Sequence, residues 1–189
     1  MAAETLSGGF ADASADAAHA FRAALNAMAR PGLITQIEGA VPPAPLSLAA
    51  GTLLLTLCDG TTPLHLAGEA DCPDVRAWLA FHTGAPLVPA GEAQFAVGTW
   101  EALHPLEAYA IGTAEYPDRS ATLIVEDETL SPEGARLTGP GIETSARMRL
   151  PEVAAFQRNA ALFPLGLDFY FTAGAQLAAL PRTTKVEAA

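Results

Sequence analysis

The sequence is poor in positive charge, and lysine is nearly absent from it. Ten basic residues stand against 21 acidic ones, which gives a net charge of −11, and Lys185 is the only lysine. A chain of this charge repels nucleic-acid backbones and anionic membrane surfaces, so we expect neither as a partner. Enzymes that use pyridoxal phosphate (PLP) need a lysine for the Schiff base, and Lys185 lies in a polar segment. We therefore expect no cofactor.

Cysteine is also scarce. Cys58 and Cys72 are 14 positions apart, and they form neither a Cys-x-x-Cys motif nor the triplet that an iron–sulfur cluster needs. The four histidines lack the spacing of zinc ligands, so the sequence predicts no metal site. These histidines are His19, His65, His82 and His104.

No long hydrophobic run is present. The longest, 46–58, is interrupted by Ser47, Gly51 and Thr52, and it falls short of the ~20 residues that span a bilayer. The first twenty residues are acidic and lack the basic start of a signal peptide. Half of the residues are hydrophobic and 16% are charged, which is typical of a compact folded protein. We expect one cytoplasmic domain, 1–189, with free thiols.

The usual catalytic motifs are missing as well. No Gly-x-Gly-x-x-Gly follows a strand, and no Walker lysine or Gly-x-Ser-x-Gly elbow occurs. Neither cysteine has a histidine near it in the sequence. The sequence thus nominates no catalytic residue.

What is present is a regular alternation of helical and extended patterns. Asp12 or Ser14 is suited to cap a first helix, in which Phe21, Leu25 and Met28 recur at helical spacing. One hairpin interrupts the alternation, so we predict an α/β fold, a single domain with a mixed sheet covered by helices. The predicted helices are 12–29, 46–57, 74–82, 105–110, 151–162 and 176–180; the predicted strands are 33–37, 63–67, 94–97, 120–125 and 168–172, and the hairpin joins 136–138 to 142–149.

Two short motifs have both a structural and a ligand-binding interpretation. Gly139 and Gly141 flank Pro140, and the glycines either form a hairpin turn or expose amides to an anion. His82 and Thr83 end a helix, where the histidine either satisfies the last carbonyls or contacts a ligand.

The segment Arg182-Thr183-Thr184 is a further candidate. The planar guanidinium of Arg182 suits a carboxylate or a phosphate, and two hydroxyls follow it directly. In extended geometry Arg182 and Thr184 share one face. The alternative is an edge strand whose polar residues are solvated.

The segment 115–120 is the richest in chemically active groups: two carboxylates, a phenol, a guanidinium and a hydroxyl. An acid–base role would need burial. Because Pro117 and Asp118 favour a turn, we interpret the segment as a turn that leads into the strand from Ser120.

Taken together, the motifs resemble the PhnH family, the H subunits of the bacterial carbon–phosphorus lyase system. His65 departs from the expected pattern, which has tryptophan after Thr-Pro-Leu. The segments that carry the resemblance are 21–22 through 31–32, 54–57 with 62–63, 81–83 with 85–88, 95–97, 112–114, 121–124, 137–139 with 141–142, 163–166 with Asp168, and 181–184 with Val186.

The resemblance implies a homodimer whose fold is similar to the large domain of PLP-dependent transferases, without the PLP. It also implies a complex with the G, I and J subunits, aided by the L subunit, that transfers the ribose triphosphate of ATP to an alkylphosphonate and releases adenine. The radical step belongs to a cluster-bearing J subunit, a role that the missing cysteine triplet excludes here. We expect an accessory subunit that is inactive alone; the alternative is an independent anion-binding protein or enzyme.

Overall fold

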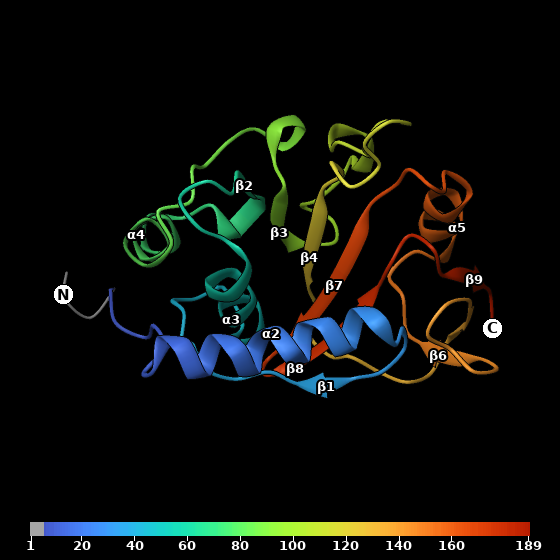
Figure 1. The fold of residues 1–189 in the computed structure, drawn as a ribbon, viewed down its shortest axis with the longest axis horizontal. Helices are drawn as coiled ribbons and strands as arrows, with labels where there is room; N and C mark the ends of the chain where they lie inside the picture. Colours follow the sequence, from blue (N-terminus) through green and yellow to red (C-terminus); the bar gives the residue numbers. More distant parts are fainter. Residues whose placement is uncertain (1–5) are drawn as a thin grey trace.

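A six-stranded mixed sheet forms the centre of the computed structural model, which describes residues 6–189 (Figure 1). Strands β2, β3, β4 and β7 are parallel, and β8 and β1 add antiparallel strands at one edge. In spatial order the strands are β1 (Thr35–Gln36), β8 (Gln176–Leu180), β7 (Asp168–Ala173), β4 (Thr122–Glu126), β3 (Phe95–Thr99) and β2 (Leu64–Leu66).

Alternation of side chains along the strands divides the interior into two cores. On β7, Phe169 and Phe171 point into one core and Tyr170 into the other. On β4, Leu123 points into the same core as Phe169, and Ile124 into the same core as Tyr170. Both faces of the sheet are thus covered, as the apolar strand sequences require.

The first core lies under α2 (Ala13–Ala29), α3 (Leu48–Leu57) and α4 (Pro73–His82). Asp12 caps α2 and Ser47 caps α3, each with a side-chain oxygen that accepts a backbone N–H. Alanines at positions 20, 24 and 27 form the buried face of α2, so this helix packs closely on its neighbours. The larger Phe21 and Leu25 are 52% and 56% exposed.

The second core lies under α5 (Val153–Ala161) and a small antiparallel sheet. Trp100 stacks on Phe156 at 4.9 Å between ring centroids, and Phe156 meets the ring of Phe169 edge-on. The small sheet has the order β6 (Ala146–Met148), β5 (Ala135–Thr138) and β9 (Lys185–Glu187); three single 3-10 turns are η1 (Gly68–Ala70), η2 (Ala90–Glu92) and η3 (Leu106–Ala108).

The long elements confirm the sequence predictions, but the predictions of two short helices were wrong. Residues 176–180 are strand β8, because Gly174, at a φ of 57°, allows a tight turn that pairs Ala173 with Gln176. The helix predicted for 105–110 is one 3-10 turn, since Ile111 already pairs with Ser120. The predicted hairpin is present as β5–β6, joined by the longer loop 139–145.

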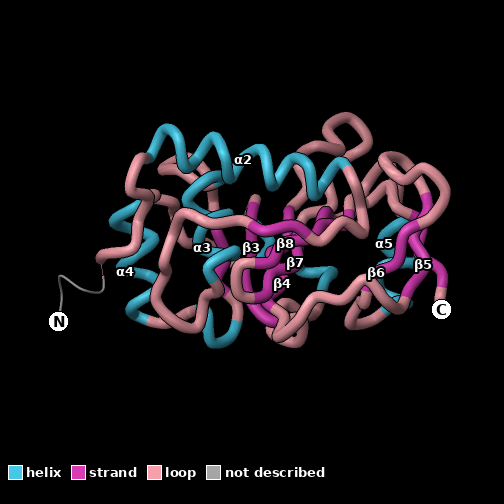
Figure 2. Tube along the Cα trace, turned by 90° about the horizontal axis from the view of Figure 1, so that it is seen from below, coloured by secondary structure: helices cyan, strands magenta, loops and turns pink. Residues whose placement is uncertain are grey.

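Figures 1 and 2 place α4 and α5 at opposite ends of the molecule, with the sheet between them. Between residues 6 and 189, no helix is long and apolar enough to cross a membrane.

Candidate functional site

Arg182 is held in a network of hydrogen bonds at the edge where β4 and β7 begin. Its backbone N–H donates to Asp168 Oδ1 over 2.8 Å, and its Nε donates to the same oxygen over 3.2 Å. Nη1 donates to the Pro117 carbonyl over 2.7 Å, while Nη2 donates to Ser120 Oγ and to Asp168 Oδ2. The Arg182 side chain is 12% exposed.

This network leaves Arg182 little capacity for a ligand. One donor of Nε, one of Nη1 and two of Nη2 are in use, which is four of the five N–H groups of a guanidinium. The Asp168 carboxylate also offsets its charge. An anion would have to displace Asp168, so the geometry is that of an internal ion pair.

The segment 115–120 forms the predicted turn, and Arg182 holds it in place through Pro117 and Ser120. The Arg119 guanidinium lies 3.9 Å from the centre of the Tyr116 ring, a cation–π contact.

Gly139 and Gly141 both lie where another backbone comes close. A Cβ on Gly141 would lie 1.9 Å from the Ala29 carbonyl oxygen, and one on Gly139 would lie 3.1 Å from that of Thr183. Positive φ angles of 81° and 132° also favour glycine. Gly139 thus adjoins the segment of Arg182. Thr184 is 1% exposed, and its hydroxyl has no hydrogen-bond partner within the described chain.

His82 and Thr83 lie at the end of α4, at the far end of the molecule from α5 (Figure 1). His82 Nε2 donates to the Leu6 carbonyl over 2.9 Å, and its ring packs on Trp78. Thr83 Oγ1, rather than the histidine, donates to the Leu79 carbonyl over 2.7 Å. The structure therefore does not bring these two residues together with Arg182.

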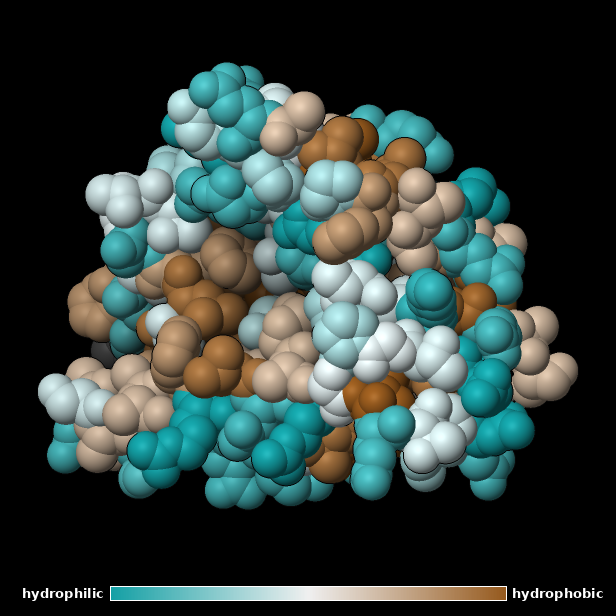
Figure 3. Space-filling view, turned by 45° about the vertical axis from the view of Figure 1, so that its right-hand side comes forward, coloured by the Kyte–Doolittle hydropathy of each residue, from teal (hydrophilic) through white to brown (hydrophobic). Residues whose placement is uncertain are grey.

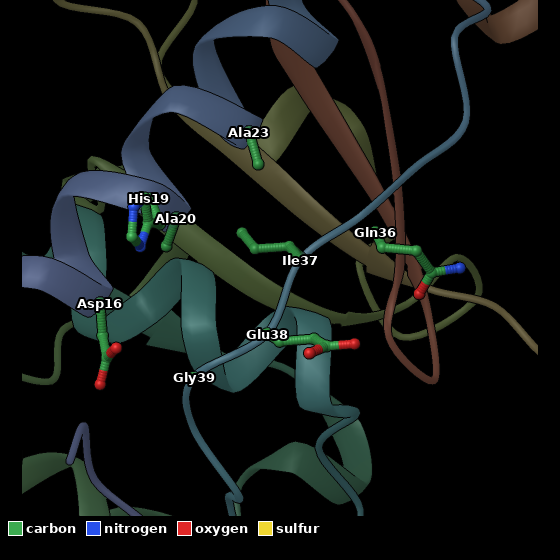
Figure 4. A pocket seen from close by; sticks show the side chains of 8 residues that line it. All are labelled: Asp16, His19, Ala20, Ala23, Gln36, Ile37, Glu38 and Gly39. Carbon is green, nitrogen blue, oxygen red and sulfur yellow. The ribbon is translucent and has the colours of Figure 1, made fainter.

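An open cleft of about 570 Å³ lies between α2 and residues 36–39 (Figure 4). Its polar side chains include Asp16, His19 and Glu38. Figure 4 shows these three directed to separate parts of the cleft, without a common point. Among residues 6–189, no three His, Cys, Asp or Glu side chains are grouped to hold a metal.

Glu126 is a partly buried carboxylate that sequence inspection missed. It ends β4 and accepts the Ser47 N–H over 2.7 Å and the Thr172 hydroxyl over 2.9 Å. Burial raises the pKa of Glu126 above its usual value. The residue joins β4 and β7 to the start of α3. A charged residue that ends an apolar strand was the available signal, but its partners lie 79 and 46 positions away.

The helical layer covers the first residues of β3, β4 and β7 only in part. Phe95, Thr122 and Asp168 form a row across β3, β4 and β7, and all three are only partly buried. The next row on the same face, with Val97, Ile124 and Tyr170, is no more than 7% exposed. The Tyr170 hydroxyl donates to the Ala24 carbonyl of α2, so the helix crosses at this second row.

We call the exposed Phe21 and Leu25 of α2, taken together with this partly buried row, the open face. On a helical wheel Phe21 and Leu25 lie opposite Asp16 and Ala23, which line the cleft beside residues 36–39. In Figure 1 residues 36–39 follow β1 below α2, whereas β3, β4 and β7 begin above that helix. Figure 3 shows a hollow with hydrophobic side chains above a hydrophilic band.

Other aromatic residues do not contribute to this surface. Trp100, Phe169 and Phe171 are 8%, 0% and 1% exposed and belong to the second core. Tyr116, at 41%, is exposed on its turn.

Comparison with known proteins gives consistent results. Residues 8–187 match the family described as bacterial phosphonate metabolism protein (PhnH). The chain is similar to the alpha-D-ribose 1-methylphosphonate 5-triphosphate synthase subunit PhnH of Rhizobium meliloti (strain 1021), with 42% identity over 96% of this chain and 95% of that protein. It is also similar to the putative C-P lyase subunit protein HtxG of Stutzerimonas stutzeri, with 30% identity over 88% and 84%.

Proposed function

Because the chain belongs to the PhnH family of bacterial phosphonate metabolism proteins, we propose that it is an accessory, non-catalytic subunit of the carbon–phosphorus lyase system. In this role it forms a homodimer and assembles with the G, I and J subunits, with the L subunit acting alongside. The assembly transfers the ribose triphosphate of ATP to an alkylphosphonate and releases adenine. The isolated chain is inactive in this scheme.

The observation that carries the proposal is the open face. Phe21 and Leu25 are both more than half exposed, whereas the buried positions of the same helix are alanines. Phe21 and Leu25 lie one turn apart on α2, and exposed apolar side chains grouped in this way are typical of protein interfaces. Stable interfaces remove ~1,600 Å² from water in total, which the two residues alone cannot supply, so neighbouring sheet positions must take part.

Electrostatics also favour a role through protein contacts. ATP and alkylphosphonates are anions, whereas the chain has a net charge of −11. Its most buried arginine, Arg182, is paired with Asp168. A partner subunit with basic residues would supply the positive charge that this chain lacks.

Co-purification of a double variant tests the open face. We expect Phe21→Glu with Leu25→Glu to reduce recovery of partner subunits with the tagged chain at least tenfold. Phosphonate-dependent growth should be lost too. Because both side chains are exposed, the variant should fold normally.

Phe81→Glu is the matched control, since Phe81 is 64% exposed on α4. It should assemble like the unmodified chain. Normal assembly of the double variant would contradict the role of the open face.

The alternative function is an independent anion-binding protein that uses Arg182, Thr183 and Thr184, with Gly139 and Gly141 nearby. It requires the Arg182–Asp168 pair to open for the ligand. His82 and Thr83 would then form a separate contact at the other end of the molecule.

A further inference from the structure

A second cleft, of about 420 Å³, opens between the η3 turn and α5. This volume is in the range of small-molecule sites, which are mainly apolar with a few placed polar groups. It lies on the second-core side of the sheet, away from the open face. Its apolar walls are formed by Leu106, Ile111, Ala155, Leu162 and Leu167.

Arg158 supplies positive charge at this cleft. Its side chain is 64% exposed, and one Nη2 donor meets Glu152 Oε1 at 3.0 Å. That is the only hydrogen bond of this guanidinium to residues 6–189, so four of its five donors remain available. This differs from Arg182, where four donors are already in use.

His104 lies beside the same carboxylate. Its Nδ1 donates to the Trp100 carbonyl over 2.7 Å, which leaves Nε2 at 3.7 Å from Glu152 Oε2. Glu152 therefore lies within 4 Å of two basic side chains, of which Arg158 is the one that donates a hydrogen bond to it. Glu107 is a second carboxylate at the cleft, and it is exposed to solvent.

Tyr109 also lines the cleft and is 5% exposed. Its hydroxyl has no hydrogen-bond partner in the part of the chain described here, and its oxygen is not enclosed by protein. Burial raises the pKa of Tyr109 to about 12, so the hydroxyl stays protonated at neutral pH and can donate. Asn159, by contrast, is satisfied by two hydrogen bonds of 2.8 Å with the backbone of Leu167.

We propose that this cleft binds a small organic anion whose alkyl or aryl group lies among the leucines and whose acidic head meets Arg158. An apolar cavity alone would suit a neutral hydrocarbon. The four available donors of Arg158 favour an acidic head instead. That the head is a phosphonate rests on the proposed function, whereas the anion site itself does not.

Phenylphosphonate is the probe, and titration of the isotope-labelled purified chain followed by NMR is the measurement. We expect saturable shifts at Arg158, His104 and Leu167 with a dissociation constant of roughly millimolar, as suits about ten non-hydrogen atoms. Arg158→Gln should weaken binding about tenfold. Arg136→Gln should leave it unchanged, because Arg136 is a comparably exposed arginine paired with Glu187 elsewhere.

Two further ligands test the apolar group and the acidic head separately. Inorganic phosphate, which lacks the apolar group, should bind at least tenfold more weakly than phenylphosphonate. Benzoate distinguishes the heads: binding as tight as that of phenylphosphonate would support the anion site and overturn the phosphonate assignment.

Leu162→Asp gives a second variant that is expected to fold, since Leu162 is 44% exposed. The added charge in the cleft wall should weaken phenylphosphonate binding about tenfold. The proposal would be overturned if no saturable shifts appeared, or if both cleft variants bound phenylphosphonate as tightly as the unmodified chain does. Because this titration uses the chain alone, its failure would leave the co-purification result unaffected.

Discussion

The carboxylate of Asp168, the first residue of β7, accepts both the backbone N–H and the Nε of Arg182, over 2.8 and 3.2 Å. The two side chains are 22% and 12% exposed, so the pair is largely shielded from water. Through Pro117 and Ser120 the same arginine also fixes the turn before β4.

Removing this arginine should destabilise the fold. Arg182→Ala leaves Asp168 as a shielded charge without its partner, and we expect a loss of about 3 kcal/mol in the free energy of unfolding. Urea denaturation measures it. Arg136→Ala, which breaks an exposed pair with Glu187, should cost less than ~1 kcal/mol. Equal losses would show that Arg182 is not structurally important.

The isolated chain should bind neither ATP nor methylphosphonate to a measurable extent in calorimetric titration. The net charge of −11 and the paired state of Arg182 are the reasons. Methylphosphonate would gain little in the cleft beside α5, because one methyl group contributes only ~0.8 kcal/mol of apolar burial. Micromolar ATP binding that disappears in Arg182→Ala would favour the independent anion site.

Glu126 should make stability depend on pH. Because its pKa in the folded chain is raised above 4.5, the folded state holds a proton that the unfolded state has released. The contribution of Glu126 to the stability of the fold is therefore fully present below about pH 4.5. It is lost as the pH rises through the pKa that Glu126 has in the folded chain.

Glu126→Gln should flatten this dependence and leave stability at pH 7 unchanged or higher. The amide oxygen still accepts the Ser47 N–H, and the Thr172 hydroxyl can donate to the Val125 carbonyl. Urea denaturation at pH 5 and pH 8 compares the variants, with the exposed Glu187→Gln as control. If stability changed between pH 5 and pH 8 as much in Glu126→Gln as in the unmodified chain, Glu126 would not be the source of the pH dependence.

The two thiols should differ in reactivity. Burial raises the pKa of Cys58 to about 12, and this residue is 6% exposed, whereas Cys72 is only partly buried. A disulfide reagent at pH 8 should modify Cys72 quickly and Cys58 only after unfolding. Cys72→Ser should remove the fast reaction and Cys58→Ser should preserve it; rapid modification of Cys58 would show that this region opens.

The sequence predicts elements whose signal is local and fails where distant contacts decide. The helix over Ala13–Ala29 has its cap and spacing within one segment, so it was found. Which side of that helix is buried depends on neighbours, and the small Ala24 faces the core while Phe21 remains outside. Residues 176–180 contain good helix formers, yet pairing with β7 makes them a strand.

The polar network was equally hard to predict. Arg182 was identified as a candidate from its own chemistry, but Asp168 and Ser120 lie 14 and 62 positions earlier. Without the sheet register, nothing indicated that a turn, a strand start and this arginine meet. A free guanidinium and a neutralised one look identical in sequence.

The separation of Ser120 from Arg182 also has a consequence during synthesis. The ribosome makes Ser120 62 residues before the arginine that holds it, and Asp168 14 residues before. A nascent chain that has completed β7 therefore has an unneutralised carboxylate beside an unfixed turn. Translation must therefore proceed past Arg182 before the turn at Ser120 and the start of β7 can reach their final arrangement.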